Sequence, residues 1–267
     1  MAYNRNKKQE NDKFYTKQDT VKKVLSKIDI EKFDVVIEPS AGDGSFTKEI
    51  KHKNIISLDI EPEAEGIKRQ DWLKFDGDGI SGKILVVGNP PFGNQGTLAL
   101  KFIRKSTEIN VDTIAFILPK SFKKDSIKNK IPLLYHLVEE IDLEDDSFTL
   151  EGNSYKVPCV FQIWVRSDKE RTQKLLKKTT NLFNFVKKNE DADFAFRRVG
   201  FYAGKHFKEI QDKSEQSHYF IKSNIDTEVL SNIIGGIKWD HNNTAGPRSI
   251  GKGELIEQVE KIYNTSI

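Results

Sequence analysis

Four short apolar runs follow one another in the first half of the chain, and each ends in polar or turn-forming residues. They are FDVVIEP (33–39), NIISLDI (54–60), GKILVVGN (82–89) and DTIAFILP (112–119). Segments with helical spacing of apolar residues lie between some of them, as in SFTKEIKHK and GTLALKFIRKSTEI. Apolar runs of this length that alternate with helices are typical of βαβ units, whose parallel sheet is buried on both faces. The sequence therefore predicts an α/β fold with a mostly parallel sheet.

Two further runs predict a departure from the parallel pattern. Only the turn-rich DSFTLEGNSYK separates VEEIDLED (138–145) from VPCVFQIWVR (157–166), so a hairpin is expected there. One of its strands is then antiparallel, at or near one edge of the sheet. Before the first strand, the apolar residues of DTVKKVLSKIDI have helical spacing from Asp19 onward, which predicts a helix.

The composition of the sequence changes after Arg166. SDKERTQKLLKKTTNLFNFVKK is strongly basic, and DADFAFRRVGFYAGKHF mixes aromatic with basic residues. We therefore predict a flexible lead over residues 1–12, an α/β domain over 13–166 and a basic, aromatic region over 167–267. In the last region, HYFIKSN is expected to form a strand and GELIEQVEKIY a helix.

Composition excludes several classes of protein. Hydrophobic residues make up 37% of the 267 residues, enough for a core, and the net charge of +3 permits a polyanionic partner without requiring one. The single cysteine, Cys159, excludes an intrachain disulfide framework and a cysteine-based zinc cluster. No apolar run approaches the roughly 18 residues of a membrane span, and the N-terminus lacks the apolar centre of a secretory signal. A protein of the cytoplasm, or of a nuclear or viral compartment, is expected rather than a secreted one.

A glycine-containing loop, VIEPSAGDGSF (36–46), follows the first strand. Glycines between a strand and a helix let the backbone approach a nucleotide-like ligand closely. Here the third glycine of a dinucleotide loop is missing, and the acidic Glu38 and Asp43 flank Gly42 and Gly44. This pattern disfavours a pyrophosphate and favours a cationic or hydroxyl-bearing ligand, although a purely structural turn is the alternative.

Two carboxylates follow the glycine loop at positions suited to the same ligand. Asp59 ends the second strand, where α/β sheets bind ligands, and can accept hydrogen bonds from both hydroxyls of a ribose. Ile60 can then pack on an adenine face. Asp71, in RQDWLKF (69–75), can accept from an adenine amino group, with Trp72 or Leu73 beside it. A solvated acid before a turn and a tryptophan in the core are the alternative interpretations.

The sequence Asn89-Pro90-Pro91-Phe92 follows the buried strand Leu85-Val86-Val87. Proline has no N–H and favours extended geometry in the residue before it, so the two prolines hold the Asn89 side chain and the nearby carbonyl groups in a fixed display. Fixed acceptors need little reorganisation during a reaction. Together with the ring of Phe92, these groups suit a planar amine such as the exocyclic amine of a nucleobase.

These motifs resemble those of the amino-group methyltransferases that use S-adenosylmethionine, and most of all the N6-adenine methyltransferases. NPPF matches their catalytic signature, EPSAGDGSF matches their cofactor loop, and LDIEP and RQDWLKF fall at the expected intervals. KFYTKQDTVKKVL (13–25) resembles the segment that precedes the cofactor loop in the gamma-ordered subgroup. The resemblance covers residues 13–166 and implies a Rossmann-like class I fold with a seven-stranded sheet, followed by a small C-terminal region for substrate recognition.

The resemblance also implies roles for individual residues. Phe14, Tyr15 and Thr16 are expected to contact the methionine end of S-adenosylmethionine. Glu38, Ala41, Gly42 and Gly44 are expected to form the floor of the cofactor site, with Asp59 on the ribose, Ile60 on the adenine face, and Asp71 and Trp72 closing the adenine pocket. Asn89 and the Pro90 carbonyl are expected to hold the target amine, with Pro91 fixing the turn and Phe92 stacking on the base. Family members transfer the methyl group by direct in-line displacement, without a metal or a covalent intermediate.

Residues 167–267 are where contacts to nucleic acid are expected. Basic side chains interleaved with aromatic ones suit such a surface. The candidates are Lys174, Lys177, Lys178, Arg197, Arg198, Lys205, Arg248 and Lys252. A lysine-rich solvated segment beside an ordinary aromatic core is the alternative.

The leading functional hypothesis is N6-adenine methylation of DNA on a flipped-out or unpaired base. The first alternative keeps this chemistry with RNA as the substrate. Methylation of a protein glutamine, or a non-catalytic subunit that binds nucleic acid or a partner protein, remain further alternatives.

Overall fold

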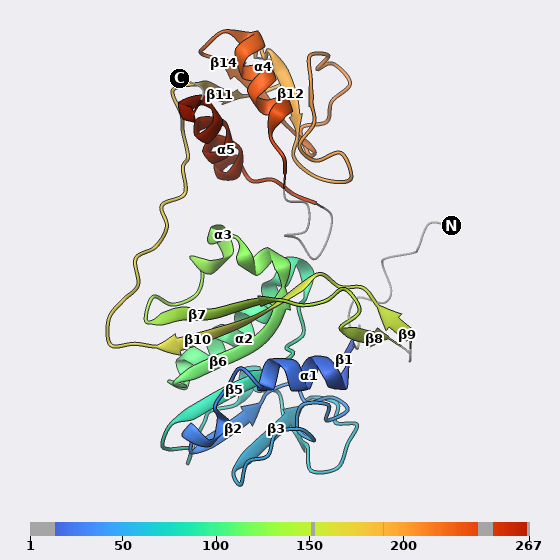
Figure 1. Ribbon diagram of the computed structural model, residues 1–267, viewed down its shortest axis with the longest axis vertical. Helices are drawn as coiled ribbons and strands as arrows, with labels where there is room; N and C mark the ends of the chain where they lie inside the picture. Colours follow the sequence, from blue (N-terminus) through green and yellow to red (C-terminus); the bar gives the residue numbers. More distant parts are fainter. Residues whose placement is uncertain (1–13, 151–152, 189, 240–247, 266–267) are drawn as a thin grey trace. The chain divides into compact units, whose positions relative to one another are not determined.

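The computed structural model describes residues 14–150, 153–188, 190–239 and 248–265, and the predicted lead over residues 1–12 lies outside them (Figure 1). The chain divides into two compact units between Gln173 and Lys174. The boundary predicted from the sequence follows Arg166, the last residue of the final strand of the first unit.

A seven-stranded sheet forms the centre of the first unit. Its strands are, in spatial order, β4 (Lys68–Arg69), β3 (Ile55–Asp59), β2 (Val35–Glu38), β5 (Ile84–Gly88), β6 (Thr113–Pro119), β10 (Cys159–Arg166) and β7 (Tyr135–Asp142). The first five pair in parallel, whereas β10 is antiparallel to both β6 and β7. The predicted fold class is confirmed, including the antiparallel strand near one edge.

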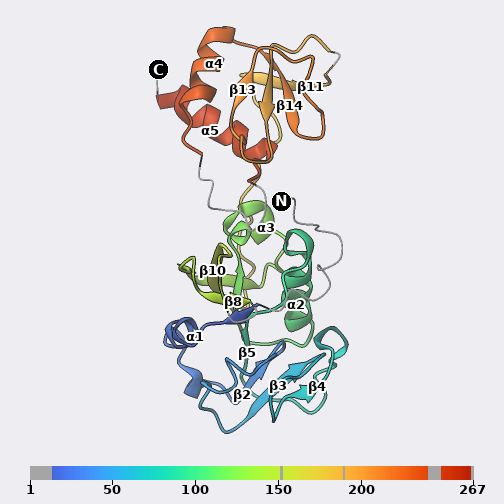
Figure 2. The ribbon, with the colours of Figure 1, turned by 90° about the vertical axis from the view of Figure 1, so that its right-hand side faces the viewer.

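Both faces of this sheet are buried, which explains the continuous apolar runs. One face packs against α2 (Thr97–Glu108), and the other packs against α1 (Gln18–Leu25). Neighbouring residues of β2 alternate between the two cores, since Val35 and Ile37 face α2 whereas Val36 faces α1. Figures 1 and 2 show the two helices beside the sheet.

The segment after the glycine loop differs from its prediction. SFTKEIKHK was expected to form a helix, but residues 42–49 form consecutive turns. Two helical hydrogen bonds are present, from Lys48 N to Gly44 O and from Ile50 N to Phe46 O, and they do not extend into a helix. A single turn fixes several residues for few hydrogen bonds, so it does not propagate without further packing. The remaining short helices of this unit are η1 (Ile30–Lys32), η2 (Trp72–Lys74), η3 (Asn94–Gly96), η4 (Lys120–Lys123) and α3 (Asp125–Lys128).

A small second sheet joins two distant parts of the first unit. β1 (Tyr15–Thr16) pairs antiparallel with β8 (Phe148–Leu150), which pairs in turn with β9 (Asn153–Tyr155). The sequence predicted only turns between 146 and 156, because three-residue strands are too short to produce a visible alternation.

The second unit contains a four-stranded antiparallel sheet and two helices. Its strand order is β11 (Phe183–Val186), β14 (His218–Ser223), β12 (Phe194–Arg197) and β13 (His206–Phe207). The helices α4 (Thr227–Gly236) and α5 (Lys252–Thr265) pack on it through Leu230, Leu255 and Ile256, and Asp226 caps α4. The predicted strand HYFIKSN and the predicted closing helix are both present (Figure 2). Among the helices described, none has the length and apolar composition needed to span a bilayer.

Candidate active site

The carboxyl ends of β2 and β5 meet at the point where the strand order of the sheet reverses. The chain runs from β2 outward to β3 and β4, then returns to the other side of β2 with β5 and β6. In open α/β sheets such a switch point opens a crevice in which ligands bind. The two loops are in contact here, because Ser40 Oγ donates a hydrogen bond to the Asn89 carbonyl oxygen over 3.1 Å.

The glycine loop is tied to the end of β3 through Asp59. Its carboxylate accepts a hydrogen bond from Gly42 N at 2.8 Å and another from Glu61 N at 2.8 Å. Gly42 has φ +49°, and a methyl group added there would lie 3.8 Å from Tyr15 Cε1. The structure therefore brings Gly42, Asp59 and Tyr15 together, as predicted for a shared site.

Glu38, at the end of β2, is buried beneath the glycine loop with 1% of its surface exposed. Burial raises the pKa of this carboxyl group to about 8, an effect that hydrogen bonds from Thr47 reduce and the charges of Asp43 and Asp59 increase. Thr47 Oγ1 bonds to the carboxyl group and lies 2.7 Å from Ser57 Oγ. Burial therefore favours the protonated, neutral form of Glu38 at the start of the glycine loop.

Asn89, just past β5, is a half-buried side chain with one end bonded and the other free. Its Nδ2 donates to Thr16 Oγ1 over 3.2 Å. Its Oδ1 is buried and has no hydrogen-bond partner among the described residues. A buried acceptor without a partner costs folding free energy and commonly marks a functional site.

The rest of the NPPF motif fixes this arrangement. Pro90 is buried and Pro91 is exposed, while Phe92 is half-buried and contacts both hydrophobic cores. The Phe92 carbonyl accepts hydrogen bonds from Leu98 N at 3.0 Å and Ala99 N at 3.3 Å, at the start of α2. The motif is therefore held by the sheet on one side and by a helix on the other.

The remaining residues predicted for the cofactor site differ in their placement. Ile60 is 60% exposed beside Asp59, Ala41 and Gly44 are buried in the loop, and Phe14 is half-buried against the core on the α1 side. Asp71 caps η2 by accepting from Leu73 N at 2.9 Å. Trp72 is 1% exposed and its Nε1 donates to Phe102 O over 3.2 Å. Trp72 is thus a core side chain, and its predicted role in closing the adenine pocket stays a prediction.

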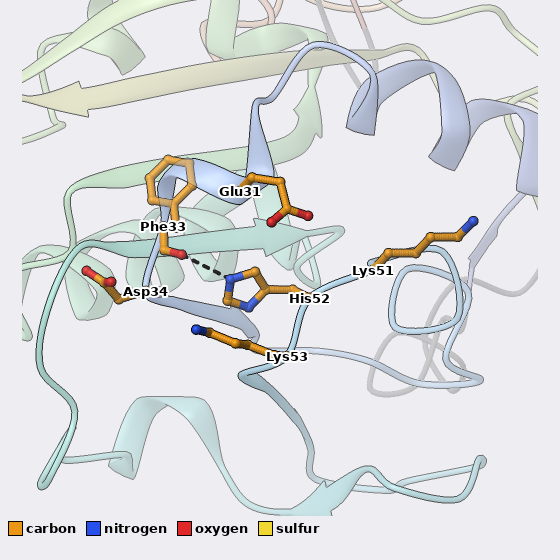
Figure 3. A pocket seen from close by; sticks show the side chains of 6 residues that line it. All are labelled: Glu31, Phe33, Asp34, Lys51, His52 and Lys53. Atoms are coloured by element: carbon orange, nitrogen blue, oxygen red, sulfur yellow. Dashed lines mark hydrogen bonds between the residues drawn. The ribbon is translucent and has the colours of Figure 1, made fainter.

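A hollow of about 420 Å³ lies at the opposite end of the sheet (Figure 3). Its lining residues precede β2 and β3, and they are Glu31, Phe33, Asp34, Lys51, His52 and Lys53. The His52 ring nitrogens lie 3.0 Å from the Phe33 and Asn54 carbonyl oxygens, which gives the ring a structural role. Parallel sheets bind ligands at the carboxyl ends of their strands, so this hollow is not the candidate active site.

Two of the lysines predicted to contact nucleic acid are paired with acids of α5. Lys174 Nζ lies 3.0 Å from a Glu257 carboxylate oxygen, and Lys177 is paired with Glu260. Lys178 is exposed. The acids on one face of GELIEQVEKIY were visible in the sequence, but their pairing with a segment about 80 residues earlier was not.

The other basic candidates lie against aromatic rings or the backbone. Arg197 donates to Val199 O at 2.7 Å and to Ser217 Oγ at 2.9 Å, which leaves it a mainly structural role. Arg198 and Lys252 both lie over the Tyr219 ring.

An exposed aromatic pair carries the two remaining basic candidates. Phe201 is 76% exposed and Tyr202 is 55% exposed, and their rings meet edge to face with centroids 5.1 Å apart. Lys205 lies over the Tyr202 ring at 4.9 Å, and Arg248 lies over the Phe201 ring at 5.5 Å. This is the combination of stacking surface and positive charge that was predicted from the sequence.

The strand order, the single antiparallel strand beside the edge and the loops at the switch point define a Rossmann-like class I methyltransferase fold. The comparison with known families agrees, since residues 30–180 match the EDM2 methyltransferase-like domain. This match covers more than half of the chain, and the protein belongs to that family.

The individual proteins that resemble this chain are only distantly similar to it. Over 114 residues the chain is 31% identical to Protein ENHANCED DOWNY MILDEW 2 of Arabidopsis thaliana, a match that covers 38% of this chain and 9% of that protein. Among solved structures, a putative RNA methyltransferase from Pyrococcus horikoshii is 18% identical with a TM-score of 0.42, covering 56% of this chain and 82% of its own. The N-methyltransferase NodS from Bradyrhizobium japonicum, solved with S-adenosyl-L-homocysteine, is 13% identical with a TM-score of 0.41, covering 56% and 85%.

Proposed function

We propose that this protein transfers a methyl group from S-adenosylmethionine to the N6 amino group of adenine in DNA. The observation that carries the proposal is the buried Asn89 Oδ1, an acceptor without a partner among the described residues, at the sheet switch point. Fold membership alone does not support a substrate, because one fold serves many reactions. The acceptor in its NPPF setting supports an amine as the group that receives the methyl group.

The residues around the glycine loop fit S-adenosylmethionine. Each Asp59 carboxylate oxygen accepts one backbone N–H and retains lone-pair capacity for a ribose hydroxyl. The exposed Ile60 offers an apolar surface for adenine, and burial favours the neutral form of Glu38 at the start of the loop. Asp71 is proposed to accept from the adenine amino group, and Phe14, Tyr15 and Thr16 to lie toward the methionine end. When bound, the cofactor supplies a methyl group on a sulfonium, which is already a strong electrophile.

The NPPF motif is proposed to prepare the nucleophile. An exocyclic amine is a poor nucleophile because its lone pair is delocalised into the ring. Asn89 Oδ1 and the Pro90 carbonyl each accept one N–H of the amine, which favours the pyramidal form whose lone pair can attack. Each hydrogen bond contributes roughly 1–3 kcal/mol in a site without water. The bound cofactor would supply the methyl group for the new N–C bond as its C–S bond breaks, and the proton on nitrogen would leave to solvent afterwards.

The second unit supports a nucleic acid as the substrate. Phe201 and Tyr202 expose aromatic rings beside Lys205 and Arg248, and such surfaces bind unpaired bases and phosphates. A target base inside a duplex must be flipped out before it reaches a crevice of this kind, and stacking and phosphate contacts compensate for that cost. We therefore expect affinity for DNA that falls steeply with salt concentration.

The test is to incubate the protein with labelled S-adenosylmethionine and DNA, RNA or a protein mixture, then digest and identify the product. Labelled N6-methyldeoxyadenosine is the expected result. Label found only in N6-methyladenosine from RNA transfers the assignment to RNA, and label found only in glutamine removes the nucleic-acid substrate. A chain that binds nucleic acid but not S-adenosylmethionine in calorimetry would be a non-catalytic subunit instead.

A further inference from the structure

Thr16 is the hydrogen-bond partner of one end of the Asn89 amide. Its Oγ1 accepts from Asn89 Nδ2 over 3.2 Å, and Thr16 itself is 6% exposed. The opposite end of the same amide, Oδ1, is the buried atom without a partner. One hydroxyl thus occupies the donor end and leaves the acceptor end available.

The orientation matters because the two ends of a carboxamide have nearly the same shape and opposite polarity. With Oδ1 in the crevice, Asn89 accepts a hydrogen bond from an incoming amine. After a half turn about the last side-chain bond, Nδ2 would face the amine, and two donors would oppose each other. An unsatisfied donor at that point is costly in a buried site. The prolines fix the backbone of Asn89 but do not select between these two orientations.

The Thr16 hydroxyl is itself held in place by a remote segment. In β1, Thr16 pairs with Phe148 of β8, a residue that is 1% exposed. The next residue, Lys17, donates its backbone N–H to Ser147 O over 3.0 Å, and its Nζ bonds to Asp146 at 3.2 Å and Ser154 Oγ at 3.1 Å. These contacts anchor the backbone on both sides of Thr16 and so fix the position of the hydroxyl oxygen that accepts from Asn89 Nδ2.

We infer that Thr16 is a positioning residue that locks the Asn89 amide with Oδ1 toward the substrate amine. The inference rests on the proposed function, and it assigns to Thr16 an action on the target amine in addition to any contact with the cofactor. The small β1–β8–β9 sheet then has a functional role, because it holds the residue that orients the Asn89 amide.

The first experiment needs no substrate. In ¹⁵N-labelled protein, the side-chain amide signals of Asn89 are assigned by their loss in Asn89→Asp. We expect Thr16→Val to shift these signals and speed their exchange with water, whereas Thr16→Ser keeps them in place. Unchanged Asn89 signals in Thr16→Val, with backbone signals showing an intact fold, would overturn the inference whether or not the protein methylates DNA. If Thr16→Val does not fold, Thr16→Ala replaces it.

The second experiment is a double-mutant cycle on turnover of the DNA probe. Thr16→Val should lower kcat about tenfold, as expected for loss of one hydrogen bond, with KM for S-adenosylmethionine nearly unchanged, and Thr16→Ser should restore it. In the Asn89→Asp background the same Thr16→Val change should cost about twofold or less, because a carboxylate presents an acceptor in either orientation. A raised KM with unchanged kcat, or equal losses in both backgrounds, would show that Thr16 serves only the cofactor or the fold. A wild-type protein that methylates nothing refutes the proposed function, while the amide signals still decide the inference.

Discussion

The ends of β2 and β5 lie side by side, and each carries a polar side chain, which is buried for Glu38 and half-buried for Asn89. At the end of β2, Glu38 is bonded to Thr47 and keeps its proton because burial disfavours its charge. At the end of β5, Asn89 is bonded at Nδ2 and has no partner at Oδ1 among the described residues. The two side chains therefore differ in role at the switch point of the sheet. Glu38 supports a loop from below, whereas Asn89 keeps one atom available for something that is not part of the chain.

The variant Asn89→Ala is the most direct test of the role assigned to Asn89 in this comparison. Losing one preorganised acceptor should lower kcat roughly 10²–10³-fold, because that contact matters most in the transition state. Binding of S-adenosylmethionine, measured by calorimetry, should remain, since the proposed cofactor contacts come from residues other than Asn89. Asn94→Ala is the matched control, as it removes an exposed amide from the same loop. Turnover by Asn89→Ala at the level of that control would refute the acceptor role.

The substitutions Gly93→Ala and Gly42→Ala compare how well the loop after β5 and the glycine loop tolerate an added methyl group. Gly93 has φ +66°, and a methyl group there would lie 2.7 Å from Leu98 Cβ, whereas at Gly42 the nearest atom is 3.8 Å away. Gly42→Ala should therefore lower the free energy of unfolding only by backbone strain, about 1 kcal/mol. Gly93→Ala adds a clash and should cost about 3 kcal/mol. Urea unfolding measures both, and equal losses would show that the loop after β5 relaxes as easily as the glycine loop.

The pH dependence of stability tests the assignment of Glu38. Its pKa is raised in the folded protein to about 8 from its usual value of 4.5, so between these values the folded state holds a proton that the unfolded state has released. This contribution to stability is complete below pH 4.5 and is lost as the pH rises through 8. Glu38→Gln keeps the shape of the neutral acid without the titration.

As the pH rises from 4.5 to 8, the wild type should lose stability relative to Glu38→Gln. The difference between their free energies of unfolding should change by roughly 1 kcal/mol per pH unit in favour of the variant. The exposed Glu31→Gln serves as the control and should not alter the slope. Parallel pH profiles for wild type and Glu38→Gln would mean that Glu38 is ionised in the folded protein.

Much of the catalytic half could be predicted because its signals are local. β5 and β6 are continuous apolar runs with turn residues after them, and NPPF and the glycine loop are contiguous motifs. The helix expected after the glycine loop is replaced by turns, and the sequence left open whether Trp72 lies in the core. Trp72 turns away to bond Phe102 O, about 30 residues later in the chain, and no local pattern contains that contact.

The sequence shows that the second unit is rich in basic residues, but it does not show which of these charges are available to a phosphate. Lys177 and Arg248 each count as one positive charge in the sequence. The structure pairs Lys177 with Glu260 and places Arg248 over an exposed phenylalanine ring. An exposed ion pair contributes little to stability, yet it reduces the charge available to a phosphate.

The sequence alone determined the class of the fold, because the period and length of its apolar runs allow few arrangements other than a two-faced parallel sheet. It also determined where the polar loops would gather, since parallel strands end at one edge. Only the tertiary structure decided the state of the groups within those loops. Burial makes Glu38 a neutral acid, and Thr16, brought next to Asn89 by pairing with β8, sets the direction of the amide. Both effects depend on atoms from distant parts of the chain, and desolvation and hydrogen-bond polarity act only once those parts are in contact.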